Sequence, residues 1–303
     1  MSQGSSIPPQ TAPGARHRSR AFGLLWASDR PLEQFAPSSD AGPPDVIVTN
    51  VSQLADRPAG RPVNNGAVFA DGARFRFGEA LFDIYGGERV VWAAPGADAV
   101  PDGFYGTVAA IILAWRGLAP LHGSAVELGG KAVLVAGPSG AGKSALCEAL
   151  VRRGGRLVSD DLTVMAPLTG AGVPVLLPGR PSIRLIADGA PPTGRKRLQS
   201  VPMVDLARAV PLGSLVLLGQ PPVGQGVAGA SEALIGQLFR PQWMKALPLR
   251  QARATTLFHA SRNITIRSLP GAADRPDISV DHKAEQLISG LLGWREQAHG
   301  LGT

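Results

Sequence analysis

Short apolar runs alternate with polar and turn-forming residues through the first third of the chain. This alternation is typical of half-buried strands, and it predicts strands at residues 22–26, 45–51, 67–70, 74–77, 81–85 and 89–93. Gly72, Gly78 and the pair Gly86-Gly87 punctuate the last of these runs, as turn residues of hairpins do. We therefore expect a small antiparallel β domain in this part of the chain.

The pattern changes after a Pro-containing linker at residues 95–101. An apolar run at 108–115 predicts a buried helix, and residues 124–128 and 131–136 predict a hairpin. Further elements are expected as helices at 145–153, 232–239 and 281–294, as strands at 156–159, 212–218 and 264–269, and as a Gly-rich loop at 221–229. The expected organisation is a tail at 1–21, a β-rich domain at 22–102 and an α/β domain at 103–303.

Composition is that of a globular chain, with 44% hydrophobic and 17% charged residues among 303. The tail is rich in Pro, Ser, Gln and Gly, so it cannot bury enough apolar surface to order itself, and we expect disorder there. The net charge is +7, but the arginines are scattered and no nucleic-acid-binding signature emerges. An anionic nucleotide and an anionic substrate account for the excess more simply, so no nucleic-acid partner is expected.

Targeting signals and cysteines add little. The chain begins without a basic segment followed by an apolar one, and its longest apolar run is far too short for a membrane span. A cytoplasmic protein without a membrane partner is therefore expected. The one cysteine, Cys147, allows no disulfide within the chain, and we expect it to be a small buried residue.

One stretch carries specific chemistry. Residues 137–144 read GPSGAGKS between an apolar run and a predicted helix, which is the context of a phosphate-binding loop. Such a loop points backbone N–H groups at a phosphate chain, and the following helix adds the positive end of its dipole. The lysine reaches the outer phosphates and the serine hydroxyl can hold Mg²⁺. The expected nucleotide-binding residues are Gly137, Pro138, Ser139, Gly140, Ala141, Gly142, Lys143, Ser144 and Ala145.

Two carboxylates form a second signal. Asp160 and Asp161 end the predicted strand at 156–159, and the 16 residues from Ser144 to Asp160 allow a helix and a return to the same end of the sheet. Phosphoryl transfer needs Mg²⁺ at the phosphates and a group that positions the incoming hydroxyl. Adjacent carboxylates can divide these two tasks, so we expect the pair to lie beside the phosphates.

The run LHGSA at 121–125 and the run GPSGAGKSALCEALVRRGGRLVSDD at 137–161 resemble the catalytic domain of HPr kinase/phosphorylase. In that family an H-G pair precedes the phosphate loop, and an Asp pair follows R-G-x-R-L-V. The resemblance implies an α/β fold with a P-loop kinase domain of HPr-kinase type (PEP-carboxykinase-like), preceded here by a small β-rich domain, and it implies ATP and Mg²⁺ as cofactors. It implies Asp160 as general base, Asp161 and Ser144 on the magnesium side, and His122 with Lys143 in the catalytic pocket.

The chain departs from the family after Asp161. The glutamate-containing signature segment has no recognisable counterpart, and LPGRPSIRL stands at 177–185, followed by GRKR at 194–197. With a β domain in front, this layout looks like the HPr-kinase-related kinases that tailor peptides, including the lasso-peptide kinases. Those phosphorylate a serine at the C-terminal end of a ribosomally made precursor. The resemblance covers residues 22–270, and it is strong over 121–161 and weak elsewhere.

Arginine planes suit bidentate binding of phosphate or carboxylate. We therefore expect substrate or phosphate contacts among the basic residues Arg180, Arg184, Arg195, Lys196 and Arg197.

The leading interpretation is an ATP-dependent serine kinase that acts on a peptide or small protein, most specifically a precursor peptide. The alternatives are a kinase of an HPr-type protein, a small-molecule kinase, and a nucleotide-binding regulatory protein without catalysis. Self-association into a homo-oligomer is left open.

Overall fold

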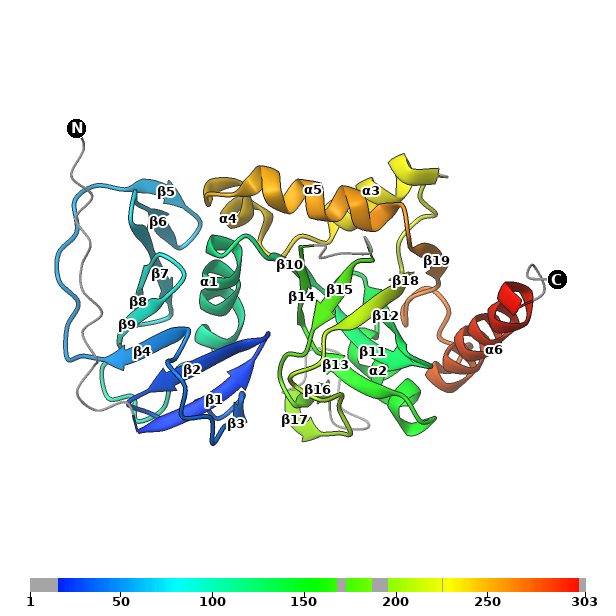
Figure 1. Ribbon diagram of the computed structural model, residues 1–303, viewed down its shortest axis with the longest axis horizontal. Coiled ribbons are helices and arrows are strands. Elements are labelled where there is room, and N and C mark those ends of the chain that lie inside the picture. Colours follow the sequence, from blue (N-terminus) through cyan, green and yellow to red (C-terminus); the bar gives the residue numbers. More distant parts are fainter. Residues whose placement is uncertain (1–15, 168–172, 187–195, 225, 300–303) are drawn as a thin grey trace.

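A computed structural model describes residues 16–167, 173–186, 196–224 and 226–299. The described strands form a nine-stranded sheet, an eight-stranded sheet and a two-stranded sheet. Figure 1 shows the first sheet at one end of the molecule and the second sheet in the middle, with helices beside both. The protein is therefore a mixed α/β structure with several sheets, as expected.

The first sheet has the strand order β3-β1-β2-β4-β9-β8-β7-β6-β5. Its strands are β1 (His17–Ala21), β2 (Leu24–Ser28), β3 (Ala36–Pro37), β4 (Val46–Asn50), β5 (Arg61–Val63), β6 (Gly66–Val68), β7 (Gly72–Phe77), β8 (Ala80–Tyr85) and β9 (Arg89–Ala93). Each of the six strands expected from the alternation overlaps one of these. The antiparallel expectation is wrong for part of the sheet, because β4 runs parallel to both β2 and β9.

The expectation of a disordered tail at residues 1–21 is wrong for residues 17–21. Residues 17–21 form β1, which pairs with β2 in an antiparallel register, and Ser19 and Ala21 are buried. The pairing satisfies the backbone of a segment that looks too polar to fold alone. Residues 1–15 lie outside the described part of the chain.

A buried helix packs against the first sheet. It starts as a π-helical turn, Phe104–Val108, and continues as α1 (Ala109–Trp115), so the helix expected at 108–115 is confirmed. Its apolar residues share one hydrophobic core with Trp26, Phe82 and Trp92 of the sheet and with Trp243 of α4 (Pro241–Ala246). The domain boundary expected at residue 103 stays a prediction, but by packing α1 lies with the sheet before it.

The second sheet has the order β10-β14-β15-β18-β12-β11-β13, and β19 also pairs with β18. Its strands are β10 (Ala119–His122), β11 (Ser124–Leu128), β12 (Lys131–Ala136), β13 (Arg156–Ser159), β14 (Leu162–Ala166), β15 (Val175–Leu177), β18 (Val210–Leu218) and β19 (Thr265–Leu269). Strands β11 and β12 form the expected hairpin, and β12 runs parallel to β18. The remaining strands, β16 (Ser182–Ile186) and β17 (Lys196–Ser200), form the small hairpin sheet.

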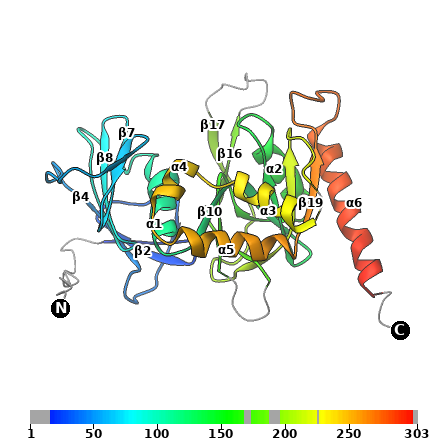
Figure 2. The same cartoon turned by 90° about the horizontal axis from the view of Figure 1, so that it is seen from above.

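Helices cover both faces of the second sheet. Successive residues of β12 point to opposite faces. Leu134 packs with α3 (Gly226–Gly236) and α5 (Arg250–Ser261), whereas Val133 and Val135 pack with α2 (Lys143–Arg152) and α6 (Val280–His299). Figure 2 shows α5 and α6 on either side of the sheet. The free thiol of Cys147, a residue of α2, is buried as expected, and burial raises its pKa.

Several late elements differ from expectation. Helix α3 begins at Gly226, so the loop expected at 221–229 is wrong over its last four residues, and the helix expected at 232–239 ends early. Helices α4 and α5 had no predicted counterpart. Within the described residues, no helix combines the length and the apolar composition needed to cross a membrane.

Candidate functional site

The phosphate-loop sequence joins the end of β12 to the start of α2, as the motif requires. Gly142 stands at the N-cap with a φ of 97°, a conformation that L side chains rarely adopt. A Cβ at Gly137 would collide with the backbone oxygen of Leu218 on the neighbouring strand β18. These two glycines therefore fix the curvature of the loop. Because the first N–H groups of a helix have no partner within it, the start of α2 suits an anion.

The two polar residues at the start of α2 point in different directions. Lys143 is nearly buried, and its Nζ donates to the backbone oxygens of Gly137 (2.8 Å) and Pro138 (3.0 Å). This places the ammonium group at the rim of the loop. The Ser144 hydroxyl instead donates to Oδ1 of Asp160 at 2.9 Å. The chain therefore returns to the phosphate loop at Asp160, as the sequence spacing predicts.

Asp160 is a buried carboxylate with every oxygen in use. It is 1% exposed, and its Oδ1 also accepts a hydrogen bond of 2.5 Å from Ser124. Its Oδ2 accepts one of 2.7 Å from the backbone N–H of Arg184. Asp160 is therefore held rigidly beside Ser144.

Asp161 faces the other way. It has a φ of 68° between β13 and β14, and this turn directs its side chain away from Asp160. Its carboxylate is 36% exposed, with Oδ1 3.6 Å from His122 Nδ1 and Oδ2 3.5 Å from Arg180 Nη2. A non-glycine residue held at positive φ is typical of functional sites. The two neighbouring aspartates thus differ in access, because only Asp161 is open to a cavity.

His122 lies at the end of β10, where its backbone N–H donates to Gln237. Burial lowers the pKa of its imidazole, the charge of Lys143 lowers it further, and Asp161 acts in the opposite direction. The imidazole is therefore mainly neutral at pH 7. A neutral ring can accept or donate one hydrogen bond beside Asp161.

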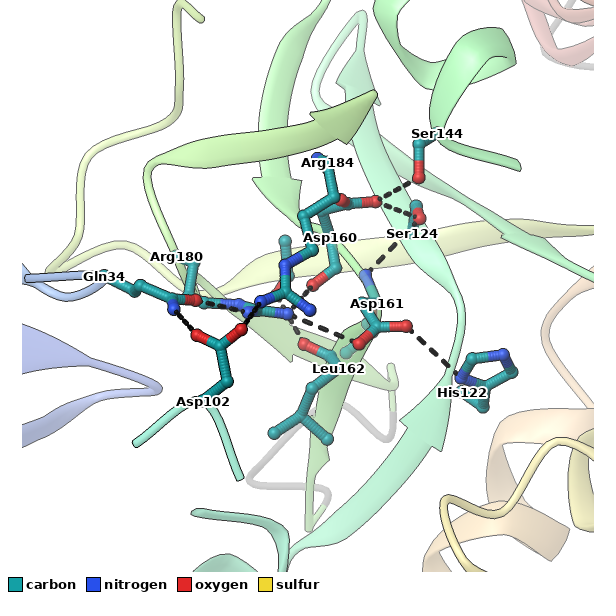
Figure 3. A network of polar contacts seen from close by, with 12 residues as sticks. Gln34, Asp102, His122, Ser124, Ser144, Asp160, Asp161, Leu162, Arg180 and Arg184 are labelled. Atoms are coloured by element: carbon teal, nitrogen blue, oxygen red, sulfur yellow. Dashed lines mark hydrogen bonds and ion pairs between the residues drawn. The ribbon is translucent and has the colours of Figure 1, made fainter. Parts of the chain in front are cut away.

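A chain of polar contacts links Asp161 to Gln34, in the loop between β2 and β3 of the first sheet (Figure 3). Arg180 is 3% exposed, and its guanidinium donates to the backbone oxygen of Asp160 (3.0 Å) and to Oε1 of Gln34 (2.8 Å). The Gln34 amide donates in turn to Asp102 at 2.7 Å, and the other oxygen of Asp102 accepts from Arg184 at 3.1 Å. Burial lowers the pKa of Arg180, although the charges of Asp161 and Asp160 oppose that shift. Arg180 is therefore held between the turn that follows β13 and the loop that joins β2 and β3.

The phosphate loop borders a cavity of about 360 Å³, within the usual range for small-molecule sites. It is lined by Ser139, Gly140 and residues 142–145 of the loop, and by His122, Asp161 and Arg184. The described candidates Arg180 and Arg197 do not line it. Arg197 is exposed on β17 opposite Leu185, and no hydrogen bond or ion pair of a described residue links it to the site.

Two basic candidates lie partly or wholly outside the described residues. Arg195 is outside the described residues, and the side chain of Lys196 is likewise outside them. Three site residues were missed by sequence reasoning. Ser124 stands inside the H-G-S-A run and could have been noticed there, whereas Gln34 and Asp102 carry no local signal because their partners are far away in the sequence.

Comparison with known proteins links part of the chain to kinases. No protein-family model matches the chain. Over 50 residues it is 46% identical to the HPr kinase/phosphorylase of Treponema pallidum. The identity is the same for the protein of strain Nichols and for that of a second strain, of subsp. pallidum. The matched segment spans 16% of this chain and 16% of each relative. A solved structure of the Hpr(Ser) kinase/phosphatase from Coxiella burnetii aligns at 20% identity over 34% of this chain and 66% of that chain, with a TM-score of 0.27.

The sequence match supports the resemblance to HPr kinase/phosphorylase for one segment. The finer resemblance to lasso-peptide kinases stays a prediction, as do the roles of the individual site residues.

Proposed function

We propose that this protein is an ATP- and Mg²⁺-dependent kinase that transfers the γ-phosphate to a serine hydroxyl of a peptide or small protein. The observation that carries the proposal is the contact between Ser144 and the buried Asp160 at the start of α2, next to the open pair Asp161–His122. A phosphate loop alone serves many nucleotide-binding proteins. The neighbouring carboxylates supply the two tasks that phosphoryl transfer adds.

The donor set fits a nucleotide with magnesium. Among the described residues no group of three or more His, Cys, Asp or Glu side chains is gathered to hold a metal ion alone. Mg²⁺ in kinase sites is usually held by one or two carboxylates together with the phosphates of the nucleotide. Ser144 and Asp160 would hold it here, and it would neutralise charge on the phosphates.

The placement of the two aspartates favours a reversal of the expected roles. The resemblance made Asp160 the base and Asp161 the magnesium-side carboxylate. Asp160, however, is buried and bonded to Ser144, which suits the metal side, whereas Asp161 borders the open cavity. We therefore assign Asp161 as the base and Asp160 to the metal.

In this assignment, Asp161 accepts the proton of the serine hydroxyl while the oxygen of that serine bonds to the γ-phosphorus of ATP. The bond between that phosphorus and the β–γ bridging oxygen breaks, and ADP leaves. Arg180 keeps the Asp161 carboxylate in place, and His122 shields it on its other side. Lys143 is positioned to move from the loop carbonyls to the phosphates.

The finer substrate is a ribosomally made precursor of the lasso type, phosphorylated on its C-terminal serine. The support is the layout: a β-rich segment precedes the site, and the family's signature segment is replaced by the strand pair β16–β17. The relatives carry the name HPr kinase/phosphorylase. An HPr-type protein is therefore the second candidate, followed by a small hydroxyl metabolite and by a regulatory role without transfer.

The test is mass spectrometry of peptides that end in serine, of an HPr-type protein and of small hydroxyl metabolites after incubation with the protein, ATP and Mg²⁺. We expect one added phosphate on a peptide. The Asp161→Asn variant should bind Mg·ATP normally and lose transfer, whereas Asp160→Asn should need far more Mg²⁺ for nucleotide binding. The exposed control Asp98→Asn should behave as wild type.

Each result points to one interpretation. If only a metabolite gains phosphate, the protein is a small-molecule kinase and the peptide proposal is wrong. If the nucleotide binds but no acceptor gains phosphate, the regulatory alternative is supported. Full transfer by Asp161→Asn would contradict the reversed assignment.

A further inference from the structure

A second cavity of about 680 Å³ shares the His122–Asp161 pair with the first cavity. Both residues line it, and so do Gly137 and Pro138 from the beginning of the phosphate loop. Ser139, Gly140 and residues 142–145 of the loop line only the first cavity. The proposed base therefore stands between two spaces, and just one of them contains the start of α2.

The wall of the second cavity comes from segments that the proposed nucleotide site does not use. They are the turn after β18 with Gln220, the end of α3 with Gln237, and the start of α4 with Arg240. Gln220 and Gln237 face each other with amide contacts of 3.4 and 3.5 Å. Amide and backbone groups of this kind suit hydrogen bonding to a polar chain rather than to an apolar ligand.

Arg240 gives this space its charge. It is exposed, and within the described residues its guanidinium has no hydrogen bond or ion pair. It lies close enough to His122 for its charge to act on the imidazole. Asp161 is the sole carboxylate among the residues that line this cavity, and it is already paired with Arg180. The guanidinium is thus available to an anion next to the base.

The backbone of Arg240 is also unusual. Its φ of 48° and ψ of 66° place it in the left-handed region. Such a conformation is unfavourable for a residue other than glycine and is typically retained where the position of the residue matters. Asp161 shares this property, so both charged residues of the cavity stand on strained turns.

We propose that the second cavity receives the phosphate acceptor and that Arg240 selects an acceptor that carries a carboxylate beside the hydroxyl to be phosphorylated. A guanidinium binds a carboxylate through paired, charge-assisted hydrogen bonds. The acceptor would approach Asp161 from one side and ATP from the other. This inference rests on the proposed kinase function and adds the chemistry of its acceptor.

The experiment compares two short peptides that end in serine, identical except that one has a free C-terminal carboxylate and the other a C-terminal amide. Binding of each peptide is measured by isothermal titration with Mg²⁺ and ADP present, and transfer from ATP is followed by mass spectrometry. Wild type should prefer the free acid about tenfold in both measurements. Arg240→Met should abolish that preference, and Arg240→Lys should retain part of it, because lysine keeps the charge but not the fork. The exposed control Arg208→Met should leave it unchanged.

The two proposals fail in different ways. Equal binding of acid and amide to wild type, or a preference that survives Arg240→Met, would overturn the role of Arg240 whether or not transfer occurs. Preferential binding of the acid that depends on Arg240, without transfer to either peptide, would support the acceptor cavity and count against the kinase function. Unchanged ATP affinity in Arg240→Met is required throughout, because a loss would place Arg240 in the nucleotide site instead.

Discussion

Gln34 lies on the first sheet's side of the molecule, yet its amide joins two residues of the site. It accepts from Arg180 at 2.8 Å and donates to Asp102 at 2.7 Å (Figure 3). Replacing it by methionine keeps the length of the side chain and removes both hydrogen bonds. Gln34→Met therefore tests whether the first sheet supports the chemistry or only stands beside it.

The magnitude follows from burial. Hydrogen bonds to charged groups contribute about 1.5–3 kcal/mol each. Asp102 is 59% exposed, so water replaces its lost partner, whereas Arg180 is 3% exposed and is left with an unsatisfied donor. We expect the free energy of unfolding to fall by about 2–3 kcal/mol. The same loss loosens the guanidinium that holds Asp161, and a misplaced catalytic group costs about 10- to 100-fold in kcat.

The assays are urea unfolding and transfer kinetics. The KM for ATP should stay within about twofold of wild type, because the residues that line the first cavity remain in place. Gln53→Met, an exposed glutamine of the same part of the chain, is the matched control and should change neither quantity. In a double-mutant cycle on stability, Gln34→Met and Arg180→Met should couple by about 1–3 kcal/mol. A loss of stability with unchanged kcat would refute the positioning role, and additive effects in the cycle would refute the contact itself.

Three further outcomes are expected. Gly142→Ala adds a Cβ at a φ of 97°, which costs about 1–2 kcal/mol and should weaken ATP binding by calorimetry; wild-type affinity would show that the loop does not need this conformation. His122 has a pKa lowered chiefly by burial, so the unfolded chain takes up the proton first and stability should fall as pH drops below about 6.5. His122→Asn should flatten that part of the pH–stability curve, and parallel curves would contradict the shift. Arg253 is 2% exposed and donates to several backbone carbonyls, so Arg253→Met should cost about 3–5 kcal/mol in urea unfolding, against a negligible change for the exposed Arg262→Met.

Local sequence was enough to place the centre of the site. The strand, loop and helix around Lys143 and the return of the chain at Asp160 are consecutive, so their spacing predicts their geometry. The different environments of Asp160 and Asp161 were not predictable, because they depend on the left-handed turn at Asp161 and on Ser124 from another strand. The resemblance assigns roles to Asp160 and Asp161 from their positions in a motif. In the structure the two differ because Asp160 is buried and Asp161 lines the cavity.

The elements that were missed lack the signals that mark element boundaries. Helices α4 and α5 begin after Arg240 and Leu249, both in left-handed conformations and without a capping side chain. Capping residues are a main sequence signal for a helix start, and neither helix has one, so the only start signal here is Pro241 in the first turn of α4. Strand β1 is mostly polar and owes its order to its partners on both sides. Such pairing depends on contacts between distant residues that the composition of a segment does not reveal.

The core that α1 shares with α4 has a consequence for biosynthesis. Trp243 packs against Phe75 with ring centroids 5.9 Å apart, and its indole donates to the backbone oxygen of Asn64 at 3.0 Å. Chains emerge from the ribosome with the N-terminus first. The first sheet is therefore complete in sequence long before the tryptophan that finishes its core is translated. It must wait with apolar surface exposed until the later helices arrive, so the nascent chain should depend on holding chaperones, and truncation before α4 should leave an aggregation-prone fragment rather than a free-standing domain.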